Sequence, residues 1–306
     1  MRKKISAPTN TTSGDEAVLS NSPGVSLQKA FDHCEALTRS HYENFPVASL
    51  FLPRKQRAYI SAIYAFARTA DDFADEGTWK PEDRLRRLDE WEEKLEGCFA
   101  GQAEDPVFIA LAETVSQMRI PRQPLADLLA AFRMDVLQNR FATYNDLLYY
   151  CQHSANPVGQ LVLYVFGCAT TRNIGLSDNI CTALQLANFW QDISIDRKKG
   201  RLYIPLEDLD RFGYTEADLD RDMVDDRFRE LMRFEVNRTK ELFAGGKPLL
   251  NEVAGMLGFE LKLTWDGGMT ILRKIEMQGY NVLEKRPKIS TVDKALIVLR
   301  AIAHRT

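Results

Sequence analysis

The spacing of apolar residues is the feature that most restricts what this chain can fold into. Apolar side chains recur at intervals of three and four residues almost everywhere, and the strict alternation typical of half-buried strands is scarce. Gly and Pro residues fall between these periodic stretches, where they separate helices. The pattern predicts an all-α protein, built as a single large helical bundle.

Proline and glycine positions divide this pattern into helices. Pro53 and Pro81 indicate helix starts, because a proline in the first turn removes no helical hydrogen bond. Gly213, Gly245 and Gly246 punctuate the second half of the chain. The predicted helices cover residues 27–41, 54–76, 81–99, 105–119, 122–140, 143–153, 157–173, 176–198, 224–244, 256–279 and 290–303.

The first residues differ in composition from the rest. Residues 1–25 are rich in Ser, Thr, Asn, Gly and Pro and lack a periodic apolar face, which predicts a disordered tail ahead of one helical domain at 26–306. Met1 to Lys4 are basic, but no apolar run follows as a signal peptide requires. The longest apolar run, Leu161 to Ala169, is far shorter than the ~20 residues of a membrane helix. We therefore expect a cytoplasmic protein.

The overall charge excludes one class of partner. The chain carries 40 Lys and Arg against 43 Asp and Glu, a formal net charge of −3, and has no basic block. A nucleic acid is therefore not an expected partner. The charged residues that bear on function lie in local motifs.

The first acidic motif lies in a segment rich in Ala and aromatic residues. At 3.6 residues per turn, one helical stripe carries Tyr64, Arg68, Asp71 or Asp72, and Asp75. Two carboxylates one turn apart repel each other, and apolar neighbours make that repulsion costlier. A divalent cation bound between them would remove the cost.

The second acidic motif lies in another apolar helix. Asn188, Asp192 and Asp196 follow one another at four-residue steps, so an amide oxygen and two carboxylates share one face. These are the oxygen ligands that Mg²⁺ prefers, together with water and phosphate oxygens. One such motif is typical of a solvated acidic face, but two copies among apolar residues favour a site that holds a diphosphate through magnesium.

With both motifs in order, the chain from about Leu27 to Arg300 resembles the squalene and phytoene synthase family, the head-to-head branch of the isoprenoid synthases. The resemblance implies the isoprenoid synthase fold, with a central active-site cavity. The matching segments are His41 to Phe45, Tyr64 to Arg68, Asp71 to Asp75, Tyr150, Ala155 to Gly159, and Asn188 to Tyr203.

The resemblance also implies roles for individual residues. Two or three Mg²⁺ ions would be held by Asp71, Asp72, Asp75, Asn188, Asp192 and Asp196. Diphosphate contacts would come from Arg68, Arg201 and Tyr203. A tunnel for prenyl chains would be lined by Phe45, Tyr64, Tyr150, Ala155, Val158, Gly159, Val162 and Gln185, with His41 beside the site.

Three of these expectations can be argued from the residues themselves. The faces of Tyr64 and Tyr150 could stabilise a carbocation. The small residues Ala155 and Gly159 lie one turn apart, which fits either a groove for an isoprenoid tail or close helix packing. We also expect an ion pair between Arg133 and Asp135 that supports the acidic helices.

Two departures from the family pattern bear on the reaction. Most members carry Arg immediately before the first Asp of the second motif, whereas this chain has Gln191. Gln191 is predicted to contact the substrate at this position, and a fixed cation near the diphosphate is predicted to be lost. Asn156 and Pro157 stand where Gly and Thr are usual. Both features resemble the hydroxysqualene synthases of bacterial hopanoid biosynthesis, which convert presqualene diphosphate and water to hydroxysqualene and pyrophosphate. No NADPH is expected for that reaction.

Two alternative functions remain open on the sequence. One is a squalene or phytoene synthase that condenses two prenyl diphosphates, and the other is a non-catalytic helical scaffold. The strong hydrophobicity of such substrates and products also suggests transient contact with the inner membrane face and with pathway enzymes. The apolar stretch Ala295 to His304 predicts a last helix packed in the core, with contact to lipid as the alternative.

Overall fold

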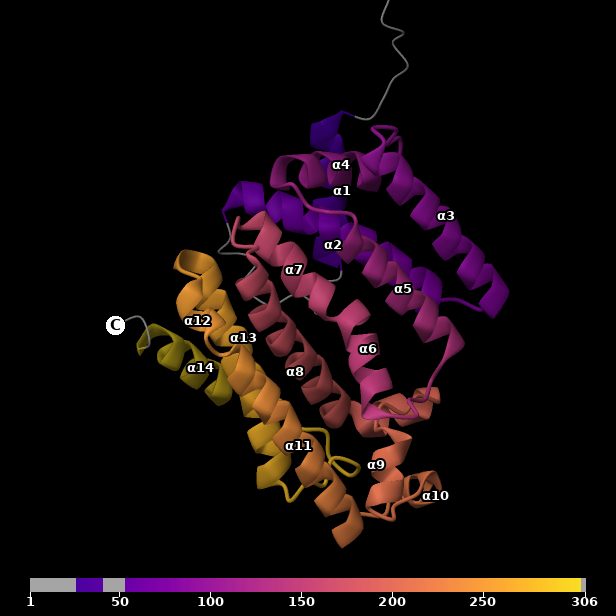
Figure 1. The fold of residues 1–306 in the computed structure, drawn as a ribbon, viewed down its shortest axis with the longest axis vertical. Coiled ribbons are helices and arrows are strands. Elements are labelled where there is room, and N and C mark those ends of the chain that lie inside the picture. The colour runs from indigo at the N-terminus through magenta and orange to yellow at the C-terminus, as the bar shows by residue number, and fades with distance from the viewer. Residues whose placement is uncertain (1–25, 41–52, 304–306) are drawn as a thin grey trace, which may run out of the picture.

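The computed structural model describes residues 26–40 and 53–303, and within these ranges it contains helices and no strand (Figure 1). The all-α prediction is confirmed. In chain order the helices are α1 (Leu27–Ser40), α2 (Arg54–Asp75), α3 (Pro81–Phe99), α4 (Pro106–Met118), α5 (Gln123–Leu137), α6 (Tyr144–Ser154), α7 (Asn156–Val165), α8 (Thr171–Asp196), the 3-10 turn η3 (Arg197–Lys199), α9 (Leu206–Arg211), α10 (Glu216–Asp220), α11 (Asp226–Gly246), α12 (Leu249–Glu252), α13 (Gly255–Met277) and α14 (Thr291–Ala303).

The junction of α7 and α8 is the main error in the predicted boundaries. Gly167 adopts a left-handed conformation with φ 67°, which ends α7 well before the predicted residue 173. The Thr170 side chain then accepts a hydrogen bond from the Asn173 backbone N–H at 3.1 Å and caps α8. The short helices α9, α10 and α12 were not predicted, because so few residues show no period.

The predicted end of α11 was also early. Gly245 and Gly246 were expected to follow the helix, but α11 continues through both. A side chain at Gly246 would collide with Ile180 of α8, so this glycine serves close packing between the two helices. The predicted tail at 1–25 and the predicted site residues His41 and Phe45 lie outside the described residues.

Two hydrophobic cores share the bundle. The N-terminal core joins α1 to α5 and centres on Phe66, Trp91 and Phe108, with the Trp91 and Phe108 rings 4.5 Å apart. The second core surrounds α8, whose Trp190 donates a hydrogen bond to Thr239 of α11 at 2.8 Å. α8 runs through the middle of the bundle and packs against α6, α7, α11, α12 and α13 (Figure 1).

Helix α7 forms the seam between the two cores. Val162 and Phe166 pack against both of them. A side chain on Gly159 would collide with Ser177 and Cys181 of α8. Of the two explanations for this glycine, close packing is therefore the one its surroundings support.

A buried charge cluster lies between α9 and α11. Arg238 contacts Asp208 at 2.8 Å and Glu235 at 2.5 Å, and its guanidinium lies 3.5 Å above the Tyr144 ring centroid. Glu235 is fully buried. Burial raises the pKa of Glu235 to about 8, because the attraction of Arg238 does not offset lost hydration and the repulsion of Asp208.

Replacing Glu235 with Gln should flatten the pH dependence of stability. The folded-state pKa exceeds the ordinary 4.5, so the folded state binds more protons between these values and loses stability as pH rises through them. We expect Glu235→Gln to reduce that loss by about 1–3 kcal/mol. Urea unfolding from pH 5 to pH 8 measures it. Glu230→Gln, on the exposed part of α11, is the control, and equal pH slopes for all three proteins would contradict the expectation.

Candidate active site

The first acidic motif occupies the C-terminal end of α2. Arg68 sits among its carboxylates and contacts Asp71 at 3.1 Å, Asp72 at 2.5 Å and Glu76 at 2.6 Å. The three- and four-residue spacing places Asp71 and Asp72 one helical turn from the arginine, whereas Glu76 lies eight residues on, just past the end of α2. One guanidinium is thus shared by three acids, which leaves this end of α2 short of positive charge.

A second arginine ties the two motifs together. After α8 ends at Asp196, Gly200 takes up a left-handed conformation with φ 76°, and the Arg201 N–H bonds back to the Asp196 carbonyl at 2.9 Å. This reversal directs the Arg201 side chain to Asp75 of the first motif, with Nη1 3.2 Å from Oδ2. The predicted diphosphate contact Arg201 therefore lies between the two acidic helices.

A third arginine reaches the second motif from the loop before α14. The Arg286 guanidinium forms a two-pronged contact with the Asp192 carboxylate, with Nη2 3.0 Å from Oδ2. Next to Asp192, the buried Gln191 donates a hydrogen bond to the Pro287 carbonyl at 2.6 Å. The predicted loss of a cation here is wrong, because Arg286 supplies one. The substrate contact of Gln191 stays a prediction, and in this structure its amide is directed at the loop.

The Gln191 hydrogen bond should act by positioning Arg286. Gln191→Met keeps the side-chain length but leaves the Pro287 carbonyl unpaired, at a cost of about 1–3 kcal/mol. We expect kcat/KM to fall roughly tenfold. In the double variant with Arg286→Gln the losses should not add, since both substitutions act through the Arg286 guanidinium. Additive losses in steady-state kinetics would contradict the positioning role.

The site concentrates negative charge where water is scarce. Although 40% of the Asp71 side chain is exposed, lost hydration raises its pKa to about 6. The positive charge of Arg68 opposes this rise, and the negative charge of Asp75 adds to it. Burial and repulsion from Asp192 raise the pKa of Asp196 to about 6 as well. Oxygen donors in this condition fit a divalent cation. Within 26–40 and 53–303, however, no three acidic, His or Cys side chains converge on one point.

The structure gives one carboxylate a different partner from the one that the sequence predicted. Asp135 on α5 accepts a hydrogen bond from the Tyr150 hydroxyl at 2.8 Å. Burial raises the pKa of Asp135 to about 7, opposed by that hydrogen bond and by Arg201, while Asp75 adds to the rise. The expected ion pair with Arg133 is wrong, because Arg133 pairs with acids of α3 instead. An acid in an otherwise apolar helical segment was the available signal.

An aromatic cluster lies beside Asp135 and Arg201. Tyr203 stacks on Phe189 with ring centroids 3.8 Å apart and an interplanar angle of 5°. The ring centroids of Tyr150 and Tyr203 lie 6.1 Å apart, and the Phe141 ring contacts both. Sequence reasoning had assigned Tyr150 and Tyr203 to different parts of the site, and the fold brings them together.

A largely apolar cavity of about 280 Å³ opens onto the first motif. Its polar end carries Arg68 and Asp71, and the predicted residues Tyr64, Val158 and Val162 belong to its wall. The remaining wall residues are Ile60, Ile63, Ala67, Leu128, Phe132 and Leu161. The predicted tunnel residues Tyr150, Ala155, Gly159 and Gln185 are not in this wall.

An all-helical bundle with two aspartate motifs, the first of them at the polar end of an apolar cavity, is the arrangement of an isoprenoid synthase. The comparison with protein families agrees: residues 38–293 match the family described as squalene/phytoene synthase, and the chain belongs to that family. Members are enzymes that act on prenyl diphosphates, so membership favours an enzyme over the helical scaffold.

Individual relatives support the same assignment. The chain is 34% identical over 292 residues to the 15-cis-phytoene synthase of Synechocystis, covering 90% of this chain and 85% of that protein. It is 44% identical to the crystal structure of the squalene synthase HpnC from Alicyclobacillus acidocaldarius, with a TM-score of 0.80 over 83% of this chain and 96% of HpnC. A dehydrosqualene synthase structure, 23% identical, has the same fold, with a TM-score of 0.80 over 91% of this chain and 97% of that one.

Proposed function

We propose that this enzyme converts presqualene diphosphate and water to hydroxysqualene and pyrophosphate, as a step of bacterial squalene or hopanoid biosynthesis. The observation that carries the proposal is the cavity whose wall changes from aliphatic side chains to Arg68 and Asp71. A prenyl diphosphate has the matching shape, with a long hydrocarbon and one highly charged end. Burial of the hydrocarbon supplies binding energy in proportion to its apolar area.

The residues of the two motifs divide the work of ionisation. Asp71, Asp72, Asp75, Asn188, Asp192 and Asp196 would hold magnesium, which when bound neutralises the leaving pyrophosphate. Arg68, Arg201 and Arg286 already lie against these acids and can turn their guanidinium groups to phosphate oxygens. The bond between carbon and the diphosphate oxygen breaks, the cation rearranges, and water supplies the new hydroxyl group and releases a proton.

This chain also provides the surroundings of the carbocation that forms when pyrophosphate leaves. Tyr64 lines the cavity next to Arg68, where its ring can face positive charge on the hydrocarbon. The apolar wall keeps other nucleophiles away from the cation. Loss of pyrophosphate and addition of water require no hydride donor, so the proposed reaction does not use NADPH.

Two observations favour squalene biosynthesis over a carotenoid precursor. Identity is 44% to the squalene synthase HpnC, against 34% to the Synechocystis phytoene synthase. Gln191 also replaces the arginine usual in the family, and its amide is held by Pro287. Incubation of the purified protein with presqualene diphosphate and Mg²⁺, without NADPH, tests the proposal. Hydroxysqualene by mass spectrometry is the expected product, and its absence would overturn this substrate.

A second candidate is a phytoene or squalene synthase that joins two prenyl diphosphates head to head. The names of the relatives favour it, since the Synechococcus elongatus protein, 31% identical over 278 residues, is also a 15-cis-phytoene synthase. Farnesyl and geranylgeranyl diphosphate in the same assay distinguish the two. A condensed hydrocarbon from either, without hydroxysqualene from presqualene diphosphate, would establish the second candidate.

A further inference from the structure

Helix α14 presents an apolar stripe to solvent. Its buried side consists of Ile297 and Ala301, and the helix packs against α13. The predicted core packing of this last helix is therefore wrong for most of its surface. One exposed stripe, at three- and four-residue spacing, carries Val292, Ala295, Leu296, Leu299 and Ile302.

The exposure of this stripe is large for apolar side chains. Leu299 is 61% exposed and Val292 68%, and Met277 at the end of α13 reaches 84%. In Figure 1, α14 lies at one edge of the bundle, on the far side from α3 and α10. Contiguous apolar surface of this kind marks an interaction site. No helix within the described ranges is long and apolar enough to cross a bilayer.

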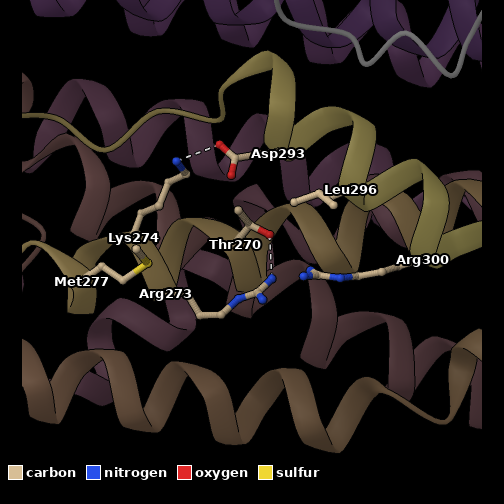
Figure 2. Close-up of a pocket in the computed structure, with 7 residues that line it drawn as sticks. All are labelled: Thr270, Arg273, Lys274, Met277, Asp293, Leu296 and Arg300. Carbon is tan, nitrogen blue, oxygen red and sulfur yellow. Dashed lines mark hydrogen bonds and ion pairs between the residues drawn. The ribbon is translucent and has the colours of Figure 1, made fainter.

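A cationic pocket of about 130 Å³ borders the stripe between α13 and α14. Figure 2 shows the guanidinium groups of Arg273 and Arg300 directed toward each other. Arg273 donates a hydrogen bond to Thr270 at 2.8 Å, while Lys274 pairs with Asp293 at 2.7 Å. Among the described residues, no carboxylate forms an ion pair with either arginine of the pocket.

We propose that this face docks the enzyme on a bilayer containing anionic phospholipids. Two guanidinium groups without a carboxylate attract an anion, and their planar N–H groups match phosphate oxygens. Leu296 lines the pocket and belongs to the stripe, so one ligand must offer phosphate and hydrocarbon side by side. A phospholipid headgroup above acyl chains does so. The inference does not depend on the proposed reaction.

A second copy of this chain fits the same face poorly. In a twofold interface centred on the pocket, Arg273 and Arg300 would meet the same cations, which repel at short range. Placed in the interfacial plane, the 13-residue helix would span about 20 Å and bury its stripe at the boundary of the acyl chains. The flanking Lys294 is exposed and adds attraction to an anionic surface.

Vesicle flotation with the full chain tests the proposal. The protein should float with phosphatidylcholine vesicles that contain phosphatidylglycerol, and binding to phosphatidylcholine alone should be at least about tenfold weaker. Arg273→Gln with Arg300→Gln, and separately Leu296→Ser with Leu299→Ser, should each weaken binding about tenfold. Raised salt should reproduce the first effect and spare part of the second.

The control removes the same charge elsewhere. Lys80→Gln with Arg221→Gln changes two exposed cations near α3 and α10 and should bind vesicles like the unchanged protein. Equal flotation of the arginine variant and this control would overturn the proposal. So would a concentration-dependent dimer abolished by the Leu296 and Leu299 changes, or full release from vesicles by millimolar inorganic phosphate, which would identify a free-phosphate site.

Discussion

Asp192→Asn should lower pyrophosphate release by about a thousandfold or more without loss of helicity, and Asp71→Asn should do the same. Each substitution keeps the side-chain shape but removes the charge that, in the proposed mechanism, would hold magnesium beside the departing diphosphate. Asp192 also anchors Arg286, so its loss frees that guanidinium from its 3.0 Å contact. Pyrophosphate release at saturating Mg²⁺, with circular dichroism on the same samples, measures both outcomes.

Asp178→Asn on the same helix is the matched control. Asp178 accepts a hydrogen bond from Gln160 at 3.0 Å, and fourteen positions of helix place it about 20 Å from Asp192. The same change of carboxylate to amide should there leave turnover within about a factor of two, since Asp178 is far from both motifs and an amide can still accept the hydrogen bond from Gln160. Undiminished turnover in both motif variants would refute the roles of the two aspartates.

Helix periodicity was sufficient to predict most of this fold. α2 and α3 begin where Pro53 and Pro81 indicated, because proline in a first turn is a local signal. The end of α7 was harder to predict, since apolar spacing continues past Gly167 and only the backbone conformation there stops the helix. Local rules therefore fix the long helices, and tertiary contacts fix the short connections.

The candidate site divides in the same way. Arg68 and its acids lie within two turns of one helix, so their proximity follows from spacing alone. Arg286 lies 94 residues from Asp192, and Gln191 lies 96 residues from its acceptor at Pro287. No local pattern connects residues so far apart. The sequence thus indicated the two acidic motifs but missed the Arg286 guanidinium, which contacts Asp192 of the second motif.

The cavity wall was the least predictable part. Ile60, Ile63 and Leu161 have the spacing and chemistry of core residues, and all three belong to the N-terminal core as well as to the cavity wall. Whether an aliphatic side chain fills the interior or lines an empty space depends on how α2, α5 and α7 pack together. That arrangement is a property of the bundle and leaves no mark in a single helix.

Val162→Trp should block the cavity and lower turnover of presqualene diphosphate about a hundredfold, because displacement of a bound substrate by even 1 Å can cost that much. Val162 lies at the seam of the two cores and in the wall of the cavity, which can accept the larger ring at the expense of substrate. Val162→Ala, which widens the same space, should retain turnover within about threefold. Steady-state rates with melting temperatures would measure this. If both variants kept full activity and stability, the hydrocarbon would have to bind outside this cavity, and the polar end formed by Arg68 and Asp71 would not be where its diphosphate lies.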